Sequence, residues 1–262
     1  MANEVLYDRL GNTALVTINR PEKMNAANKA VHNGLVDAFE KINRDPDVRA
    51  GILTGAGEKA FCAGGDLAEN LARAQGELPE EEPIGPAGEG WIQPEGWAAI
   101  DRVFKPMIAA VNGYAIGGGF GLALSCDLRL CSENAEFGTQ TKRKHFPDRQ
   151  AANLAHSLPL GWAMWFGLTG DRVNAETAYR LGIVHGVYPL PNLLEEAIKL
   201  AEIINANGLV VVQQTKQFVY NSLDMPLSTA RKMEGLYYER VRQNPDYDEG
   251  STAFVEKRHP QH

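Results

Sequence analysis

Two glycine-rich segments are the places where backbone groups of this chain could do chemistry. They are Phe61–Leu67, which reads FCAGGDL, and Val111–Gly119, which reads VNGYAIGGG. Each reads as a strand, a glycine turn and the start of a helix, where N–H groups are free and favour negative charge. Glycines also simply permit tight turns and close packing. If the two turns converge, however, they can form an oxyanion hole, in which two N–H groups stabilise a developing oxyanion.

A third glycine run, Gly55–Ala60, reads GAGEKA and imitates a dinucleotide-binding loop. That loop requires a helix to begin there, so that its N-terminus faces the pyrophosphate. Here the chain continues into Phe61–Leu67 instead, which disfavours the dinucleotide reading. The sequence also has no Walker lysine pattern, no Gly-x-Ser-x-Gly elbow and no His-Glu-x-x-His pair.

The elements around the glycine turns predict an α/β protein. An Asn-Gly-type turn at Gly11 predicts a hairpin over residues 4–19, and apolar spacing predicts the other elements. Strands are expected at 50–53, 107–111 and 128–131, and helices at 28–43, 66–73, 117–126, 161–168, 174–181, 192–205, 208–223 and 226–243. We therefore expect a core over residues 1–200 and a helical C-terminal region over residues 201–262.

Residues 75–97 are rich in Gly, Pro and Glu and interrupt this pattern. The composition predicts a surface loop. Because the stretch contains Trp91 and Trp97, a lid over an apolar ligand is the alternative.

Composition excludes several classes of protein. The hydrophobic fraction of 44% supports a sizeable core, and the formal charge of −7 argues against nucleic-acid binding. The basic run Lys142–Lys144 is too short for a nucleic-acid surface, although it could meet a small ligand's phosphates. The N-terminus lacks a signal-peptide pattern, and no apolar run reaches the ~18 residues that span a bilayer. The three cysteines fit neither a metal site nor a disulfide framework. A cytoplasmic protein without membrane contact is expected.

Several segments, in order along nearly the whole chain, carry a resemblance to the crotonase, or enoyl-CoA hydratase/isomerase, superfamily. Besides the two glycine segments, they are Asn19–Ala26 (NRPEKMNA), Phe137-Gly138, Leu168–Asp171 (LTGD), Gly182–Val184 (GIV) and Ala253–Arg258 (AFVEKR). The resemblance implies a spiral of ββα units followed by a helical region that builds trimers, two of which form a hexamer. It also implies a lyase or isomerase of acyl-CoA and fatty acid metabolism, with coenzyme A as part of the substrate and no covalently bound cofactor.

The resemblance also implies roles for particular residues. The oxyanion donors would be the N–H groups of Gly65 and Gly118, and Ala63 and Gly64 would line the adenine region. Lys23 would contact coenzyme A phosphates, as would Lys257 from a neighbouring subunit. Either lysine could equally be an ordinary surface residue.

The sequence departs from the family at the two glutamates that hydratases use as general acid and base. Their positions are occupied by Gly121 and Thr141. Glycine cannot move a proton, and a threonine hydroxyl is a poor base without a partner. Both two-glutamate hydration and single-glutamate isomerisation are therefore in doubt.

The segment 141–150 offers replacements. Asp148 resembles the working aspartate that naphthoate synthases, dienoyl-CoA isomerases and dehalogenases place at or next to this position. The spacing around it resembles that of the naphthoate synthases. His145 titrates near neutral pH and could shuttle a proton. Asp148 could instead be a surface carboxylate paired with Arg149 or Arg143. His145 could instead be a solvated loop histidine.

Two classes of function follow. The first is an acyl-CoA enzyme with a non-standard acid/base set, which leaves hydration, isomerisation, thioester hydrolysis and carbon–carbon cleavage open. The second is a non-catalytic acyl-CoA binding protein. A third reading, a subunit that serves only assembly, rests on the helical C-terminal third.

Overall fold

The computed structural model describes residues 3–78, 95–139 and 151–258. The strands are β1 (Val5–Leu10), β2 (Thr13–Ile18), β3 (Ala50–Gly55), β4 (Ala60–Cys62), β5 (Met107–Val111), β6 (Tyr114–Ile116), β7 (Leu128–Ser132), β8 (Glu136–Gly138), β9 (Arg172–Asn174) and β10 (Gly186–Tyr188). The α-helices are α1 (Lys29–Arg44), α2 (Leu67–Ala74), α3 (Glu95–Ala99), α4 (Gly118–Ser125), α6 (Ala151–Ser157), α7 (Leu160–Thr169), α8 (Ala175–Arg180), α9 (Leu190–Asn205), α10 (Leu209–Leu223), α11 (Leu227–Arg242) and α12 (Pro245–Glu256). Two 3-10 turns complete them, η1 (Pro21–Lys23) and η2 (Ile100–Arg102).

The strands of the described residues form two sheets. A six-stranded sheet has the order β1-β2-β3-β5-β7-β10, and a four-stranded sheet has the order β4-β6-β8-β9. All neighbours pair in parallel except β1 with β2 and β8 with β9. The predicted hairpin is confirmed, with Gly11 at φ 59° in its turn.

One unit repeats along the chain. A strand of the large sheet is followed by a strand of the small sheet and then by a helix, in β3-β4-α2, β5-β6-α4 and β7-β8-α6. This is the predicted succession of ββα units. Because β4 and β6 are parallel neighbours, their carboxyl ends lie at the same edge of the small sheet, and both glycine turns start there.

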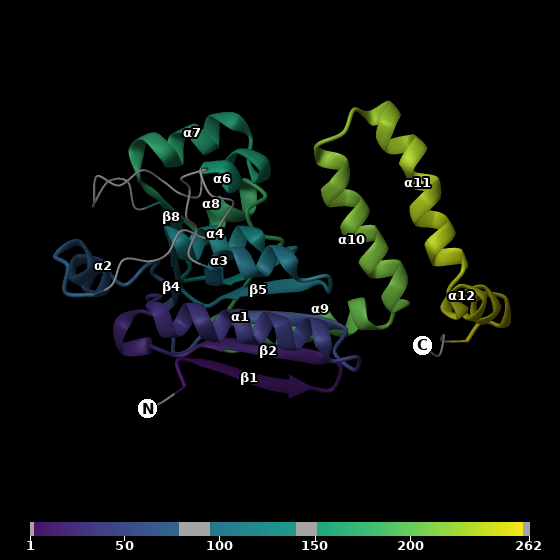
Figure 1. Ribbon diagram of the computed structural model, residues 1–262, viewed down its shortest axis with the longest axis horizontal. Coiled ribbons are helices and arrows are strands. Elements are labelled where there is room, and N and C mark those ends of the chain that lie inside the picture. The colour runs from purple at the N-terminus through teal and green to yellow at the C-terminus, as the bar shows by residue number, and fades with distance from the viewer. Residues whose placement is uncertain (1–2, 79–94, 140–150, 259–262) are drawn as a thin grey trace.

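The large sheet is covered on both faces (Figure 1). Alternate residues of its strands point to opposite sides, so Leu53 belongs to the cluster that includes α1, while Ile52 packs with α9. The α1 helix begins where the Asn28 side chain accepts the Val31 N–H at 2.9 Å, and it ends at Asp45 before Pro46. The expected domain boundary at residue 200 falls within α9 and stays a prediction.

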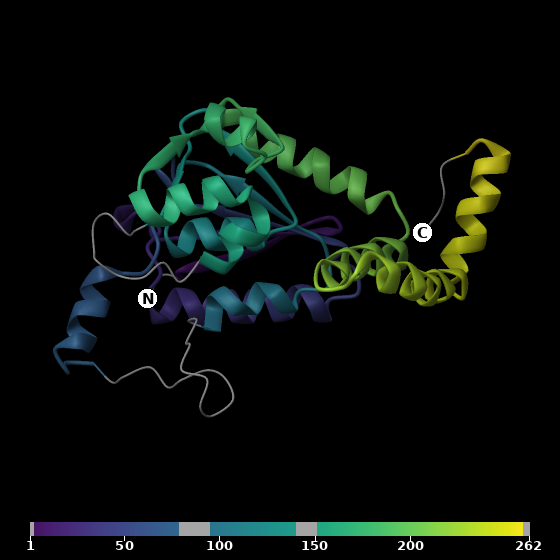
Figure 2. The same ribbon diagram turned by 90° about the horizontal axis from the view of Figure 1, so that it is seen from above.

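The last three helices extend away from the core (Figures 1 and 2). The α10 helix has no buried residue, and large apolar side chains stay exposed on α10 and α11, including Val219, Leu223 and Leu236. The described chain has no helix that is both long and apolar enough to cross a membrane.

Asp127 ties α10 to the core. Its Oδ2 accepts the Lys216 Nζ at 2.8 Å and the Met107 N–H at 2.6 Å, and its Oδ1 accepts the Tyr220 hydroxyl at 2.9 Å. The Lys216 ammonium also donates to the Lys105 carbonyl at 3.0 Å. The side chains of Asp127 and Lys216 are both 16% exposed, so little solvent screens the pair.

We expect Asp127→Ala to lower the free energy of unfolding by about 2–3 kcal/mol, because it leaves the largely buried Lys216 ammonium without its carboxylate partner and the Met107 N–H without its acceptor. Urea denaturation followed by circular dichroism measures this loss. The control is Glu239→Ala, which breaks an exposed ion pair with Arg242 and should cost no more than about 0.5 kcal/mol. Equal losses in the two variants would contradict this role of Asp127.

Candidate functional site

The turn after β4 leaves the Gly65 N–H without an acceptor. Its neighbours are all engaged: the Ala63 N–H donates to Met24 O at 3.1 Å, Gly64 N–H to Cys62 Sγ at 3.4 Å, and Asp66 N–H to Ala27 O at 2.8 Å. In the described chain the Gly65 N–H has no such partner, and the residue is partly exposed. Gly64 has φ 92°, a conformation that suits glycine.

The turn after β6 presents the Gly118 N–H in the same way. Gly117, with φ 55° and ψ −119°, caps α4, and its own N–H donates to Gly138 O at 2.9 Å. Gly118 is the first residue of α4, so its N–H has no acceptor within the helix. Gly118 is also partly exposed, whereas Gly117 and Gly119 are buried.

A close backbone contact holds the two turns together. A Cβ atom on Gly119 would lie 2.0 Å from the carbonyl oxygen of Cys62, the last residue of β4. Only glycine permits this approach, and it places the N-terminus of α4 directly against the strand that leads to Gly65. The structure therefore joins the two segments that the sequence singled out.

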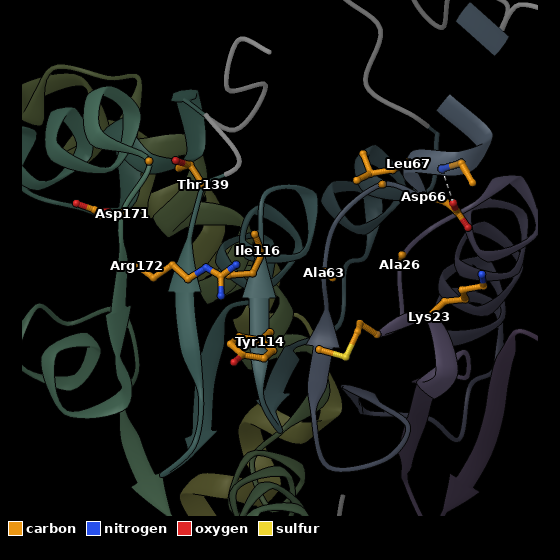
Figure 3. A pocket seen from close by; sticks show the side chains of 14 residues that line it. Lys23, Ala26, Ala63, Asp66, Leu67, Tyr114, Ile116, Thr139, Asp171 and Arg172 are labelled. Carbon is orange, nitrogen blue, oxygen red and sulfur yellow. Dashed lines mark hydrogen bonds between the residues drawn. The ribbon is translucent and has the colours of Figure 1, made fainter. Parts of the chain in front are cut away.

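A cavity of about 1140 Å³ lies beside the Gly65 turn. Figure 3 shows Lys23 and Arg172 at opposite sides of it, with Tyr114 between them. Its lining comes from η1, the β4–α2 turn and the exposed face of the small sheet: Lys23, Met24, Ala26, Ala63, Gly65, Asp66, Leu67, Ala68, Tyr114, Ile116, Thr139, Gly170, Asp171 and Arg172.

The charged groups of the cavity differ in how they are paired. Asp66 accepts Arg20 Nη1 at 3.0 Å and caps α2 by accepting the Ala68 and Glu69 N–H groups. Burial opposes the charge on Asp66, but these donors outweigh it and lower the pKa of the carboxyl. Arg172 lies over the Tyr114 ring at 5.1 Å and pairs with Glu136 at 3.3 Å. In the described residues the Lys23 ammonium has no carboxylate within ion-pair distance.

The predicted site residues fall into three groups. Lys23, Ala63 and Gly65 line the cavity, with Gly64 buried beside them and Gly118 at the adjoining turn. Lys257 directly follows α12, which lies at the opposite end of the molecule from α2 (Figure 1). His145, Asp148 and Thr141 lie outside the described residues, as does Trp91.

Position 121 carries no carboxylate, because the residue there is a glycine. Gly121 is buried within α4. Among the described cavity residues, the carboxylates are Asp66, which is paired with Arg20, and Asp171. The described part of the cavity therefore presents cations and backbone donors, but no unpaired general base close to α4.

The structure adds residues that the sequence analysis missed. Arg172 and Tyr114 line the cavity from β9 and β6, two strands of three residues each that are too short to show a periodic pattern. The prediction of a loop over residues 75–97 was wrong at the C-terminal end of that range, because α3 begins at Glu95. Trp97 is buried there rather than forming part of a loop.

Comparisons with known proteins agree with this geometry. The profile of the family described as Enoyl-CoA hydratase/isomerase matches residues 9–262. The chain is 37% identical to the (E)-benzylidenesuccinyl-CoA hydratase of Thauera aromatica over 94% of both chains. It is 33% identical to the short-chain-enoyl-CoA hydratase of Clostridium acetobutylicum, over 98% of this chain and 96% of that one. The crystal structure of an enoyl-CoA hydratase/isomerase from Mycobacterium paratuberculosis superposes with a TM-score of 0.90 at 31% identity, covering 98% and 97% of the two chains.

We expect Asp66→Asn to reduce stability by about 1–2 kcal/mol at pH 7, because Asn keeps the cap oxygen but loses the charged partner of Arg20. The folded-state pKa of Asp66 is lowered, so its contribution is present above the unfolded value of 3.8 and disappears as pH falls through the lower folded value. Urea denaturation at pH 7 and at several values below 4 tests this. The difference between wild type and variant should shrink towards zero at low pH, and a difference independent of pH would contradict it.

Proposed function

The chain belongs to the enoyl-CoA hydratase/isomerase family of acyl-CoA enzymes, and from this premise we propose that it stabilises a thioester enolate with the N–H groups of Gly65 and Gly118. The observation that carries the proposal is the pair of glycine N–H groups that have no acceptor among the described residues, in the turns that follow two adjacent parallel strands. Gly118 is the first residue of α4, and Gly65 directly precedes Asp66, the N-cap of α2; the backbone dipoles at such helix starts favour a developing negative charge.

The cavity fits a coenzyme A moiety. Its volume of about 1140 Å³ exceeds the ~300–1,000 Å³ common for small-molecule sites, as a large ligand requires. We propose that the thioester lies at Gly65 and Gly118 and that the adenine lies against Ala63 and Gly64. Lys23, whose ammonium is unpaired among the described residues, would then meet phosphate.

We propose that Asp148 and His145 supply the proton transfers. The described cavity residues offer no unpaired carboxylate near α4, and the usual glutamate position is the buried Gly121. Segment 141–150 follows directly on β8 and Thr139, which lines the cavity. The chain therefore enters this segment from the edge of the small sheet at which the turns of the two proposed donors also begin.

Hydration of an enoyl-CoA is the reaction we favour, because several relatives are named hydratases or dehydratases. A base removes a proton from water while the water oxygen bonds to the β-carbon of the substrate. The electron pair of the double bond moves onto the thioester oxygen, where Gly65 and Gly118 stabilise the enolate. Protonation of the α-carbon then completes the addition. Isomerisation, thioester hydrolysis, carbon–carbon cleavage and binding without catalysis are the alternatives.

We also propose that the chain forms a homotrimer or a hexamer. The exposed apolar side chains on α10 and α11 are typical of surface that another subunit covers. Lys257 directly follows α12, which lies at the opposite end of the molecule from α2 (Figure 1). It would contact coenzyme A phosphates only in a neighbouring subunit.

Deleting one donor tests the oxyanion hole. We expect Gly65→Pro, which lacks the N–H, to lower kcat by about 10²–10³ while acyl-CoA affinity changes only a few-fold. The matched control is Gly65→Ala, which keeps the N–H. Its Cβ would meet only the end of the Asn70 side chain, at 3.2 Å, so activity should stay near the wild-type value. Equal activity of the Pro and Ala variants would sink the proposal for Gly65.

A panel of enoyl-CoA substrates, from crotonyl-CoA to longer and aryl-substituted chains, tests the reaction through loss of the conjugated absorbance and product mass. We expect a product heavier by one water. Asp148→Asn should lower the rate by at least about 10², because the base is removed, and His145→Gln should lower it more modestly. Glu133→Gln, at an exposed position, is the control. Unchanged rates in both the Asp148 and His145 variants would exclude these residues as the acid/base set, and acyl-CoA binding without turnover would favour a binding protein.

A further inference from the structure

Trp97 lies against the backbone of the proposed donor Gly118. The side chain comes from α3, is 6% exposed, and belongs to the main core cluster. A Cβ atom on Gly118 would lie 2.9 Å from the Cε2 and Cζ2 atoms of the indole and 3.1 Å from its Nε1. The edge of the ring therefore occupies the space that a side chain at position 118 would take.

His32 of α1 also packs against the indole. The two rings meet edge to face, with centroids 4.8 Å apart and planes at 86°. The helices also touch beside them, because a Cβ atom on Gly96 would lie 2.7 Å from the Cα and Nδ1 atoms of His32. A continuous contact therefore runs from α1 through His32 and Trp97 to the first residue of α4.

The state of His32 is unusual for a residue that only fills space. The ring is 8% exposed, and its Nδ1 has no hydrogen-bond partner among the described residues. Burial, reinforced by the nearby Arg73, lowers the pKa of His32 to about 4, so the imidazole is neutral at neutral pH. A buried polar atom without a partner destabilises a fold, and an apolar side chain of similar size would avoid that loss.

The glycine turn needs support from outside itself. Gly117, Gly118 and Gly119 have no side chains whose packing could hold the peptide plane, and glycine has the largest conformational freedom of any residue. An oxyanion donor accelerates a reaction only if its direction is fixed before the charge develops. On the inner side, Cys62 O confines Gly119. Beside Gly118, the atoms nearest to the position of a Cβ belong to the indole of Trp97.

We propose that Trp97 is a positioning residue that fixes the direction of the Gly118 N–H, and that His32 orients Trp97 for this purpose. The inference rests on the proposed function, since it assigns a support to one of its two donors. It makes Trp97 a determinant of the chemical step and not of coenzyme A binding, because Trp97 is absent from the lining of the described cavity.

The test compares Trp97→Ala, Trp97→Phe and His32→Leu by kcat, by KM, and by the absorbance of a bound conjugated thioester, cinnamoyl-CoA. Polarisation of the thioester carbonyl by fixed donors shifts that absorbance to longer wavelength without any turnover. We expect Trp97→Ala to lower kcat by about 10- to 100-fold, with KM changed less than about 3-fold, and to reduce the absorbance shift. Trp97→Phe should restore most of both.

His32→Leu separates positioning from stability. Removal of a buried nitrogen that has no partner among the described residues should leave the urea midpoint unchanged or higher, yet kcat and the absorbance shift should fall several-fold. Trp162→Ala, which truncates a half-buried indole on α7, is the control for general destabilisation and should keep the absorbance shift.

Two results overturn the inference while leaving the proposed function intact. One is wild-type kcat and absorbance shift in both Trp97→Ala and His32→Leu. The other is a loss in Trp162→Ala as large as that in Trp97→Ala. If the wild-type protein binds cinnamoyl-CoA but shows neither an absorbance shift nor turnover of any enoyl-CoA, the oxyanion hole itself fails, and the proposed function fails with it.

Discussion

The approach of Gly119 to the carbonyl oxygen of Cys62 is the contact on which the rest of this site depends. A methyl group at position 119 would lie 2.0 Å from that oxygen, far inside van der Waals contact. The contact brings the N-terminus of α4 onto the end of β4. The parallel pairing of β4 with β6 then sets the two glycine turns side by side. The proposed donors Gly65 and Gly118 therefore lie on neighbouring turns, although their segments are distant in sequence.

This arrangement has a structural consequence. A site made of backbone N–H groups in glycine turns has no side chains of its own to hold it, so its rigidity must come from neighbours. The hydrogen bonds of Ala63, Gly64 and Asp66 confine the first turn. The second is confined by Gly138 O, by β4 and by Trp97. The two halves are thus supported differently, one by hydrogen bonds and one largely by packing.

The donor half and the acid/base half of the proposed site also differ in how they are built. The donors belong to the repeated ββα unit and follow from the fold. Proton transfer depends on side chains, and those can change while the unit stays intact. Gly121 illustrates this, because it occupies a buried helical position next to the donor turn without disturbing α4. The described structure therefore supports enolate stabilisation more directly than any one reaction.

Much of this was determined by the sequence itself. Periodic apolar residues located α1, β5 and the helices from α7 to α11, because long elements repeat their pattern often enough to be recognised. The order of motifs identified the family, and the glycine segments predicted the two donors that we propose, Gly65 and Gly118. The pairing within the second sheet was not predicted, since β4, β6, β8 and β9 have three residues each, too few to show a periodic pattern. For the same reason, only the tertiary structure placed Tyr114 and Arg172 in the cavity. It also moved Trp97 from an expected loop onto Gly118, because that contact joins helices distant in sequence and leaves no local pattern.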